Sequence, residues 1–460
     1  MRLPFLDRER ELQRLRRALD SREGSLVCVY GRRRVGKSRL LREATSDRRA
    51  VYYVGDARDA PLQRAALARE IAALVPGFGA VVYAEWEALL DRWWREAPDG
   101  AVLVLDEFPA LVTSSPELPS ILQKQVDLPG RKTRHLVLCG SSQRMMQGLL
   151  LDASAPLFGR ARELLKLSPL EAGWIRDAFH CVASESVDLY AAWGGIPRYW
   201  ELARDYSGRV EAVSELVLDP LGPLHREPER LLLDDIREVA RSASILTLVG
   251  QGCHRVSEIA SRLGVAATSL SRPLMRLVDL GFLDREVPFG RSVRDTKRTY
   301  YVTREPFLRL WYRFVAPNRS RLEATQVEAV SREVEAAWPE HVGGVWEDLA
   351  RRSVARLGIG GASWHPASRW WGRGRNGEPL ELDMVAEAAG DPSRVLVGEA
   401  KRSCTVREAA ALLAQIRDRA SECPPLRGKE IVPVLMVARL RGRGRQASIL
   451  TADDVLNALR

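Results

Sequence analysis

Residues Gly31-Arg-Arg-Arg-Val-Gly-Lys-Ser38 have the types and the spacing of a phosphate-binding loop, G-x-x-x-x-G-K-[ST]. Its glycines let the backbone wrap a triphosphate, the Lys37 ammonium reaches the β- and γ-phosphates, and the Ser38 hydroxyl is a ligand for Mg²⁺. The alternative is a chance match in a turn rich in arginine and glycine. We predict that ATP and Mg²⁺ bind here, with contacts from Gly31, Arg32, Arg33, Arg34, Val35, Gly36, Lys37 and Ser38.

A pair of acidic residues, Asp106-Glu107, follows the apolar stretch 101–105. Carboxylates at the end of a strand suit a Mg-nucleotide site, because Asp106 can hold the metal with its water ligands and Glu107 can polarise the attacking water. An exposed acidic turn after a strand is the alternative. The phosphate loop upstream favours the catalytic interpretation, with Ser38 and Asp106 as the magnesium ligands and Asp106 and Glu107 as catalytic residues.

The flanking sequence predicts the elements that would position these side chains. Residues 25–30 form a buried strand before the loop, and 37–45 form a helix whose N-terminus favours anions. This alternation is typical of a parallel sheet with helices on both faces, so we predict an α/β fold with a P-loop NTPase core at 1–165. Other strands are expected at 50–54, 101–105 and 135–139, and helices at 8–20, 61–75 and 84–96.

Two further polar positions gain meaning from AAA+ ATPases, which this region resembles. In those proteins a polar residue after the strand equivalent to 135–139 lies beside the γ-phosphate, which implies that Ser141 is a catalytic sensor. Arg160, in the segment 156–162, could serve as an arginine finger. A surface arginine without a catalytic role is an equal alternative for Arg160.

The resemblance becomes specific at two more motifs. Phe5-Leu-Asp-Arg-Glu-Arg-Glu-Leu12 is similar to the F-x-x-R-x-x-E-L opening of archaeal-type AAA+/STAND-like ATPases, and Gly194-Gly-Ile-Pro197 looks like the G-G-x-P element of their helical lid. The resemblance covers 1–232, places the lid at 166–232, and implies that Arg8 and Pro197 lie near the nucleotide. Arg32, Arg33 and Arg34 depart from the family pattern, and they either add phosphate contacts or face a partner.

The middle of the chain, 233–316, has the pattern of a winged helix. Two short helices at 256–264 and 267–281 are followed by strand-like segments at 282–287 and 299–302 with a basic loop between them. The second helix of such a motif can enter a major groove while the wing contacts phosphates. Winged helices also dock proteins or act as rigid spacers, so a protein partner is the alternative. The predicted DNA contacts are Ser269, Ser271, Arg272, Arg276, Arg291, Arg294, Lys297 and Arg298.

The last region, 317–460, combines a linker helix with two strand-like segments that carry Asp383 and Glu399-x-Lys401. Two carboxylates can bridge a divalent metal, and a lysine can polarise the attacking water or the scissile phosphate. This arrangement resembles the PD-(D/E)xK core of restriction-endonuclease-like α/β domains. The resemblance implies Mg²⁺ or Mn²⁺ held by Glu347, Asp383 and Glu399, with Lys401 catalytic and Gln415 at a position that such folds make polar. Such domains also serve as binding modules, so cleavage stays open.

The chain has 460 residues, of which 46% are hydrophobic and 28% charged, and this composition is that of a globular protein. Six scattered cysteines without a C-x-x-C pair favour reduced thiols. No apolar run approaches the roughly 20 residues of a membrane span, and the first residues lack the apolar core of a signal peptide, so we predict a cytoplasmic protein with no membrane partner. The net charge of +10 favours an anionic partner, although GC-rich codons also enrich arginine.

The leading interpretation is an ATP-hydrolysing AAA+-type protein that acts on DNA, with a winged helix for docking and a metal-dependent nuclease-like tail. The alternative is an ATP-driven regulatory switch that binds DNA or protein and has an inactive tail. A small-molecule kinase is disfavoured, since no acceptor domain is evident. Whether the chain forms a homo-oligomer stays open.

Overall fold

The computed structural model describes residues 3–460 except 129–132, 237, 293–297 and 443–446. The chain divides into two compact units. The N-terminal unit comprises 7–169 together with 233–235, and the C-terminal unit comprises the other described residues, which are 3–6, 170–232 and those from 236 onward.

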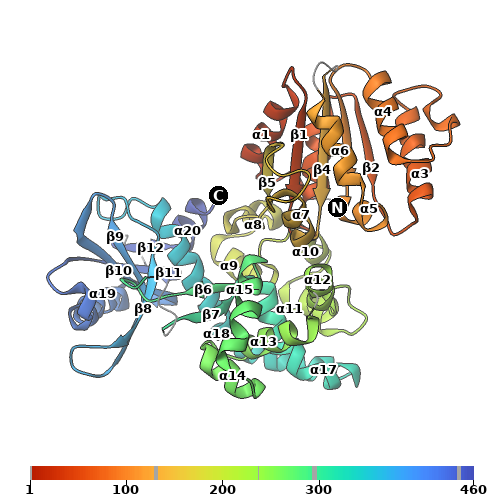
Figure 1. The fold of residues 1–460 in the computed structure, drawn as a ribbon. Coiled ribbons are helices and arrows are strands. Elements are labelled where there is room, and N and C mark those ends of the chain that lie inside the picture. Colours follow the sequence, from red (N-terminus) through yellow and green to blue (C-terminus); the bar gives the residue numbers. More distant parts are fainter. Residues whose placement is uncertain (1–2, 129–132, 237, 293–297, 443–446) are drawn as a thin grey trace. The chain divides into compact units, whose positions relative to one another are not determined.

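The N-terminal unit is built on a five-stranded sheet in which every neighbouring pair is parallel (Figure 1). The strand order is β2-β3-β4-β1-β5. The predicted parallel α/β arrangement is therefore confirmed, and four of the strands lie where the sequence places them. The strands are β1 (Ser25–Tyr30), β2 (Ala50–Val54), β3 (Ala101–Asp106), β4 (Arg134–Gly140) and β5 (Ala161–Lys166).

Apolar residues at alternate strand positions, such as Leu26 and Cys28 in β1 and Leu103 and Leu105 in β3, form one core with the helices that follow β2 and β3. Strand β3 is buried along its whole length, which explains its continuous apolar sequence. The helices of this unit are α1 (Glu9–Leu19), α2 (Lys37–Thr45), α3 (Ala60–Ala72), α4 (Trp86–Glu96), α5 (Phe108–Ser114), α6 (Leu118–Asp127) and α7 (Gln143–Leu150).

Strand β5 is the strand that the sequence analysis missed. Its sequence, Ala-Arg-Glu-Leu-Leu-Lys, mixes charged and apolar residues, and only one of its six residues is buried. A strand at the edge of a sheet has one neighbour, so it needs no continuous apolar run. Strand β5 pairs with β1 alone.

The C-terminal unit begins with helices, as expected for 166–232. They are followed by three helices and an antiparallel hairpin, β6 (Leu283–Glu286) with β7 (Tyr300–Thr303). This is the element order that the sequence predicts for 233–316. The helices are α8 (Ile175–Phe179), α9 (Ala183–Trp193), α10 (Pro197–Ala203), α11 (Arg209–Val213), α12 (Glu227–Asp235), α13 (Val239–Gly250), α14 (Val256–Leu263) and α15 (Ser271–Asp279). The last three residues of α12, 233–235, belong to the N-terminal unit.

A second five-stranded sheet, ordered β12-β11-β10-β9-β8, occupies the last part of this unit (Figure 1). Strands β8, β9 and β10 form an antiparallel meander, and helix α19 then leads to β11, which pairs with β10 in parallel. The remaining elements are α16 (Pro306–Leu310), α17 (Ala316–Glu323), α18 (Val327–Ser353), β8 (Ser368–Arg373), β9 (Pro379–Ala388), β10 (Asp391–Thr405), α19 (Val406–Glu422), β11 (Glu430–Arg441), β12 (Ile449–Thr451) and α20 (Ala452–Ala458).

Different helices pack on the two faces of this sheet. Val385, Val395 and Val397 share a core with Leu413 and Ile416 of α19. The side chains on the other face, among them Met384 and Leu396, pack with residues of α18 and α20. Both faces are therefore buried, which accounts for the apolar run at 431–438 in β11.

Candidate functional site

The carboxyl ends of parallel strands β1, β3 and β4 share one edge of the N-terminal sheet, and the predicted nucleotide residues follow these three strands. The loop after β1 has the backbone that its glycines predict. Gly31 has φ +156°, and a Cβ atom there would lie 2.4 Å from the carbonyl oxygen of Leu167. Gly36 has φ +100° and precedes the first residue of α2. A side chain at Gly31 is therefore excluded by contact, and one at Gly36 by backbone strain.

Lys37, the first residue of α2, is buried and lies over this loop. Its Nζ donates to the carbonyl oxygens of Gly31 at 2.9 Å and Arg32 at 3.0 Å. Within the described residues it forms no ion pair at salt-bridge distance. Burial lowers the pKa of Lys37, and the acidic groups nearby, including Glu107 and Asp106, oppose that shift. The ammonium is thus held by neutral carbonyls and keeps its charge available for an anion.

Asp106 at the end of β3 receives hydrogen bonds from several neighbours. Ser38 Oγ donates to its Oδ2 at 2.6 Å, the Tyr52 hydroxyl donates to the same oxygen, and the backbone N–H of Glu107 donates to Oδ1 at 2.9 Å. Burial alone would raise the pKa of Asp106, but hydrogen bonds from Cys139, Ser38 and Tyr52 outweigh it and the net shift is downward. Asp106 is therefore an ionised carboxylate beside the Ser38 hydroxyl.

Glu107 adopts a left-handed backbone, with φ +50°, directly before α5. Ser141, which follows β4, donates from Oγ to Glu107 Oε2 at 2.9 Å, and its backbone N–H lies 3.3 Å from the same oxygen. The predicted sensor and the predicted catalytic carboxylate are therefore in direct contact. Non-glycine residues with positive φ are uncommon and often occur at functional sites.

Of the other predicted nucleotide residues, Arg8 lies beside the loop. Its guanidinium donates to the carbonyl oxygen of Ser168 at 2.5 Å and lies 3.4 Å from that of Val35. Arg33 is half exposed and lies 3.7 Å from Asp234. Pro197 begins α10 of the C-terminal unit, so its predicted place near the nucleotide stays a prediction.

Arg160 lies at the other edge of the sheet, immediately before β5 begins. Its guanidinium donates to both carboxylate oxygens of Asp127, at distances of 2.8 to 3.0 Å. The structure therefore does not bring Arg160 to the phosphate loop of its own chain. An arginine-finger role would require the nucleotide of a second copy, and that stays a prediction.

Sequence reasoning missed two contributors to this site. Tyr52 reaches Asp106 because β2 and β3 pair in parallel with Val54 opposite Asp106, which places Tyr52 one pleat away on the same face. Asp235, which is distant in sequence, accepts from the Ser142 hydroxyl at 3.3 Å. The apolar and aromatic sequence of β2 could have marked a strand neighbour, but no local motif marks Asp235.

The second predicted site lies where β9 and β10 pair. The antiparallel register, with Gly398 opposite Met384, brings Asp383 next to Glu399, and the backbone N–H of Ala400 donates to Asp383 Oδ2 at 3.1 Å. Lys401 Nζ lies 2.5 Å from Glu399 Oε1, and Arg419 of α19 lies 3.2 Å from Glu399 Oε2. Two cations therefore neutralise Glu399. Gln415 is exposed on α19.

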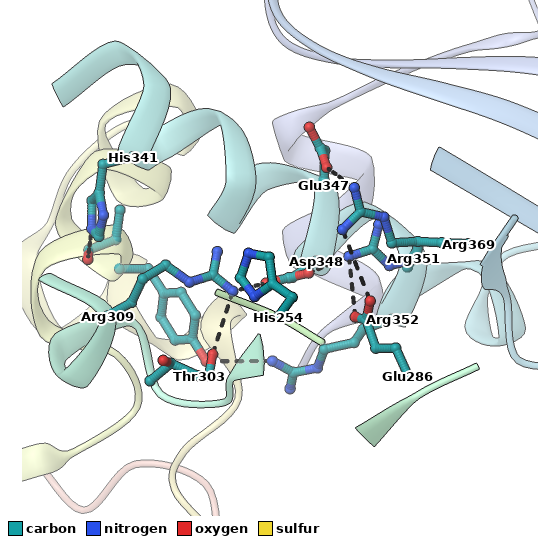
Figure 2. Close-up of polar contacts among 12 residues, drawn as sticks. His254, Glu286, Thr303, Arg309, His341, Glu347, Asp348, Arg351, Arg352 and Arg369 are labelled. Carbon is teal, nitrogen blue, oxygen red and sulfur yellow. Dashed lines mark hydrogen bonds and ion pairs between the residues drawn. The ribbon is translucent and has the colours of Figure 1, made fainter. Parts of the chain in front are cut away.

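Glu347 projects from α18 toward Arg369 of β8, with an ion-pair distance of 3.7 Å (Figure 2). Burial and, to a smaller extent, the charge of Asp383 raise the pKa of Glu347 to about 7, so these two carboxylates interact electrostatically. Glu347 also lines a cavity of about 590 Å³ shared by α13, β7, α18 and β8. Across the described parts of the chain, however, no three or more His, Cys, Asp and Glu side chains form a group that could hold a metal ion. The predicted metal set Glu347, Asp383 and Glu399 is therefore not assembled in this structure.

The predicted DNA contacts lie on α15, on the 3-10 turn Ala267–Leu270 before it and on the hairpin that follows it. Ser269, Ser271 and Arg272 are exposed, Arg276 is half buried, and Arg291 and Arg298 are exposed at the ends of the hairpin loop. Arg294 and Lys297 lie outside the described residues. The base of the hairpin packs on the C-terminal sheet, since the Tyr300 ring stacks on Trp371 with centroids 4.3 Å apart and the Phe289 N–H donates to Arg369 at 2.8 Å.

Among the described residues, no helix combines the length and the apolar character that crossing a membrane requires.

Comparisons with known proteins give matches over two parts of the chain. Residues 5–202 match the family described as an ATPase domain predominantly from Archaea, and 311–412 match a family of archaeal and bacterial proteins of unknown function. An uncharacterized protein of Methanocaldococcus jannaschii is 28% identical over 405 residues, which cover 85% of this chain and 86% of that protein.

Two solved structures are similar to parts of this chain. A Walker-type ATPase of Pyrococcus abyssi matches with a TM-score of 0.50 and 19% identity over 67% of this chain and 95% of that one. The ORC2 protein of Aeropyrum pernix matches with a TM-score of 0.42 and 17% identity over 73% of this chain and 97% of that one, and we base no conclusion on it. Residues 5–202 are therefore an archaeal-type ATPase domain with a P-loop α/β fold, and residues 311–412 are a region of the second family.

Proposed function

We propose that the N-terminal unit binds Mg-ATP at the β1–α2 loop and hydrolyses it, and that the chain uses this reaction to act on DNA. The observation that carries the first part is the convergence of Lys37, Ser38 and Asp106 with Glu107 and Ser141 at one sheet edge. Membership of an ATPase family supports hydrolysis in general.

The donor set fits a magnesium ion. Ser38 Oγ and Asp106 Oδ2 are 2.6 Å apart, and hydroxyl, carboxylate and water oxygens are the ligands that Mg²⁺ prefers. When bound, the metal would neutralise charge on the phosphates. In this assignment Ser38 binds the ion and Asp106 holds it with its water ligands. The Lys37 ammonium would exchange two loop carbonyls for phosphate oxygens, which form stronger, charge-assisted hydrogen bonds.

Glu107 and Ser141 supply the hydrolytic step in this proposal. A carboxylate that accepts a hydrogen bond from a serine is fixed in orientation, and a fixed carboxylate can align a water for attack on the γ-phosphate. The test is phosphate release with Mg-ATP. We expect Asp106→Asn to lose at least about 100-fold in turnover, because an amide binds Mg²⁺ poorly. Asp127→Asn, at the opposite sheet edge, is the matched control. Equal rates for Asp106→Asn and wild type would refute the assignment.

The second part of the proposal is that α13, α14, α15 and the β6–β7 hairpin form a winged helix that binds DNA through α15. Its support is the element order, the exposed Ser271 and Arg272 on α15, and the exposed Ser269 in the 3-10 turn directly before it. The net charge of +10 agrees with an anionic partner. The hairpin base contacts the C-terminal sheet, so we assign the wing residues Arg291 and Arg298 a secondary part.

This DNA proposal is tested by anisotropy with a fluorescent duplex over a salt series. Arg272→Ala with Arg276→Ala should weaken binding by roughly 10-fold and lower the salt slope by about 2, because two phosphate contacts are lost. Arg332→Ala, an exposed arginine on α18, should leave both unchanged. Unchanged binding by the double variant would instead favour a protein partner.

A specific observation favours a second candidate function, cleavage of DNA by the C-terminal sheet. An α-helix, a three-stranded meander, a crossover helix and a parallel strand follow one another in the order α18, β8–β10, α19, β11, which supports the resemblance to the PD-(D/E)xK core. Asp383, Glu399 and Lys401 lie together in that arrangement.

A plasmid-integrity assay with Mg²⁺ or Mn²⁺, with and without ATP, tests cleavage. The nuclease assignment requires nicking that Asp383→Ala and Lys401→Ala each abolish while phosphate release by the N-terminal unit stays unchanged. Intact plasmid under all conditions would leave the ATP-driven DNA-binding switch as the function.

A further inference from the structure

Asp235, the last residue of α12, is a buried carboxylate that no nucleotide motif includes. It is only 4% exposed although it precedes a connecting segment. Its Oδ1 accepts from Ser142 Oγ and from the backbone N–H of Arg144, each at 3.3 Å. The backbone N–H of Gln143 adds to this set. A carboxylate that meets the first N–H groups of a helix stabilises that end of the helix.

The helix that Asp235 meets is α7, which begins two residues after the sensor. Ser142 is its N-cap and accepts from the backbone N–H of Met145 at 3.4 Å. Ser141, one residue earlier, donates to Glu107 Oε2 at 2.9 Å. The contact of Asp235 and the contact that orients the catalytic carboxylate are therefore made by two adjacent serines.

The charge of Asp235 also acts on Lys37 in the candidate site. It is one of the acidic groups that raise the pKa of Lys37 against the effect of burial. Its neighbour Asp234 lies 3.7 Å from Arg33 of the phosphate loop. The segment 233–235 thus meets the site from two sides, at the loop after β1 and at the turn after β4.

We propose that Asp235 is a positioning residue for ATP hydrolysis, which fixes the turn after β4 so that Ser141 holds Glu107 in place. This inference rests on the proposed ATPase function and deepens it. Asp235 does not touch the reacting atoms; it acts through Ser142 and the start of α7. The chain continues from Asp235 and Ile236 to α13, so the residue that fixes the sensor lies four residues before the first helix of the proposed winged helix.

The proposal predicts a loss in turnover rather than in binding. Asp235→Ala should lower kcat about 10-fold and change KM for ATP less than 3-fold, because a misplaced water-aligning group weakens the transition state more than the ground state. Asp235→Asn keeps an acceptor oxygen and should recover most of kcat. Glu238→Ala, which removes an exposed acid three residues further on, is the matched control and should equal wild type.

A double-mutant cycle tests the route. If Asp235 acts through Ser142, then Ser142→Ala should lose a similar factor, and the double variant should lose little more than either single one. Should Asp235→Ala fail to fold by circular dichroism, Asp235→Asn and Ser142→Ala carry the same comparison. Losses that multiply, an unchanged kcat, or a rise in KM alone would overturn the proposal.

The two failures can be told apart. Wild-type protein without ATP turnover would refute the proposed function, and with it this inference. Wild-type turnover that Asp235→Ala and Ser142→Ala leave unchanged would refute only the positioning role.

Discussion

The two carboxylate clusters of the molecule are held in opposite ways. At the edge of the N-terminal sheet, neutral donors hold the acids: Ser38 and Tyr52 donate to Asp106, and Ser141 donates to Glu107. Lys37 is bonded to backbone carbonyls. In the C-terminal sheet, Glu399 lies between two cationic side chains, at 2.5 Å and 3.2 Å.

The type of partner, neutral or cationic, determines how much charge each cluster can offer to a ligand. Neutral partners orient a charged group without cancelling its charge, so the N-terminal cluster keeps a cation and two carboxylates available for the proposed metal-bound phosphate. The C-terminal acid is neutralised by its own protein, and a metal ion would first have to displace Lys401 or Arg419. We therefore expect large effects from changes in the first cluster and small ones from changes in the second.

The largest effect is expected at Lys37. Lys37→Met should lower kcat/KM for ATP by at least about 100-fold, because the buried ammonium is the cation held over the phosphate loop. Phosphate release measured over a range of ATP concentrations gives the value. Lys124→Met, which removes an exposed lysine of the same unit, should match wild type. A Lys37→Met protein that hydrolyses ATP at the wild-type rate would contradict the conclusion that the N-terminal cluster offers its charge to the phosphate.

A smaller effect is expected when one of the two cationic partners of Glu399 is removed. Arg419→Ala should tighten Mn²⁺ binding about 3- to 10-fold, since a partly exposed ion pair to Glu399 contributes roughly 1 kcal/mol. Isothermal titration calorimetry with Mn²⁺ measures this, and Asp383→Ala should remove the binding. Arg417→Ala, an exposed arginine on the same helix, is the control. If Arg419→Ala binds Mn²⁺ no better than wild type, the ion pair between Arg419 and Glu399 does not limit metal binding.

A third effect, on stability and not on ligand binding, concerns Glu347, whose pKa is raised to about 7, chiefly by burial and also by Asp383, against the opposing charges of Arg369 and Arg351. A carboxyl whose pKa is higher in the folded state costs stability as pH rises from about 4.5 to 7, and the full cost persists above 7. Glu347→Gln should therefore raise the free energy of unfolding at pH 8, by at most about 3 kcal/mol, and raise it less at pH 5.5.

Urea unfolding at the two pH values measures this difference. Glu328→Gln, an exposed acid at the start of the same helix, should show no pH-dependent gain. A gain for Glu347→Gln that is equal at pH 5.5 and pH 8 would mean that ionisation of Glu347 is not responsible.

Local motifs predicted most of the nucleotide site, because a phosphate loop and a strand-end acid pair are contiguous in sequence. Four of the five strands of the N-terminal sheet were also predictable, since buried parallel strands are continuous apolar runs. Strand β5 was missed because an edge strand carries charged residues. Tyr52 and Asp235 were missed for another reason, namely that their roles come from strand register and from a chain segment about 90 residues after Ser142.

The C-terminal sheet shows the limit of motif reasoning in a different way. The pattern of Asp383, Glu399 and Lys401 predicted two adjacent strands, and the strands pair as an antiparallel hairpin. The pattern could not predict Arg419, which comes from the following helix and neutralises Glu399. Arg160 illustrates the same limit, since its place before β5 at the far sheet edge follows from topology and not from its sequence neighbours.

The central claim, that Glu107 held by Ser141 hydrolyses ATP bound at the β1–α2 loop, is tested most directly by Glu107→Gln. The measurement compares ATP affinity, from equilibrium binding, with single-turnover hydrolysis in the same protein. The account predicts affinity within about 3-fold of wild type and hydrolysis at least about 100-fold slower, because the amide keeps the contact with Ser141 but cannot accept a proton. Hydrolysis at the wild-type rate, or loss of ATP binding together with activity, would contradict it.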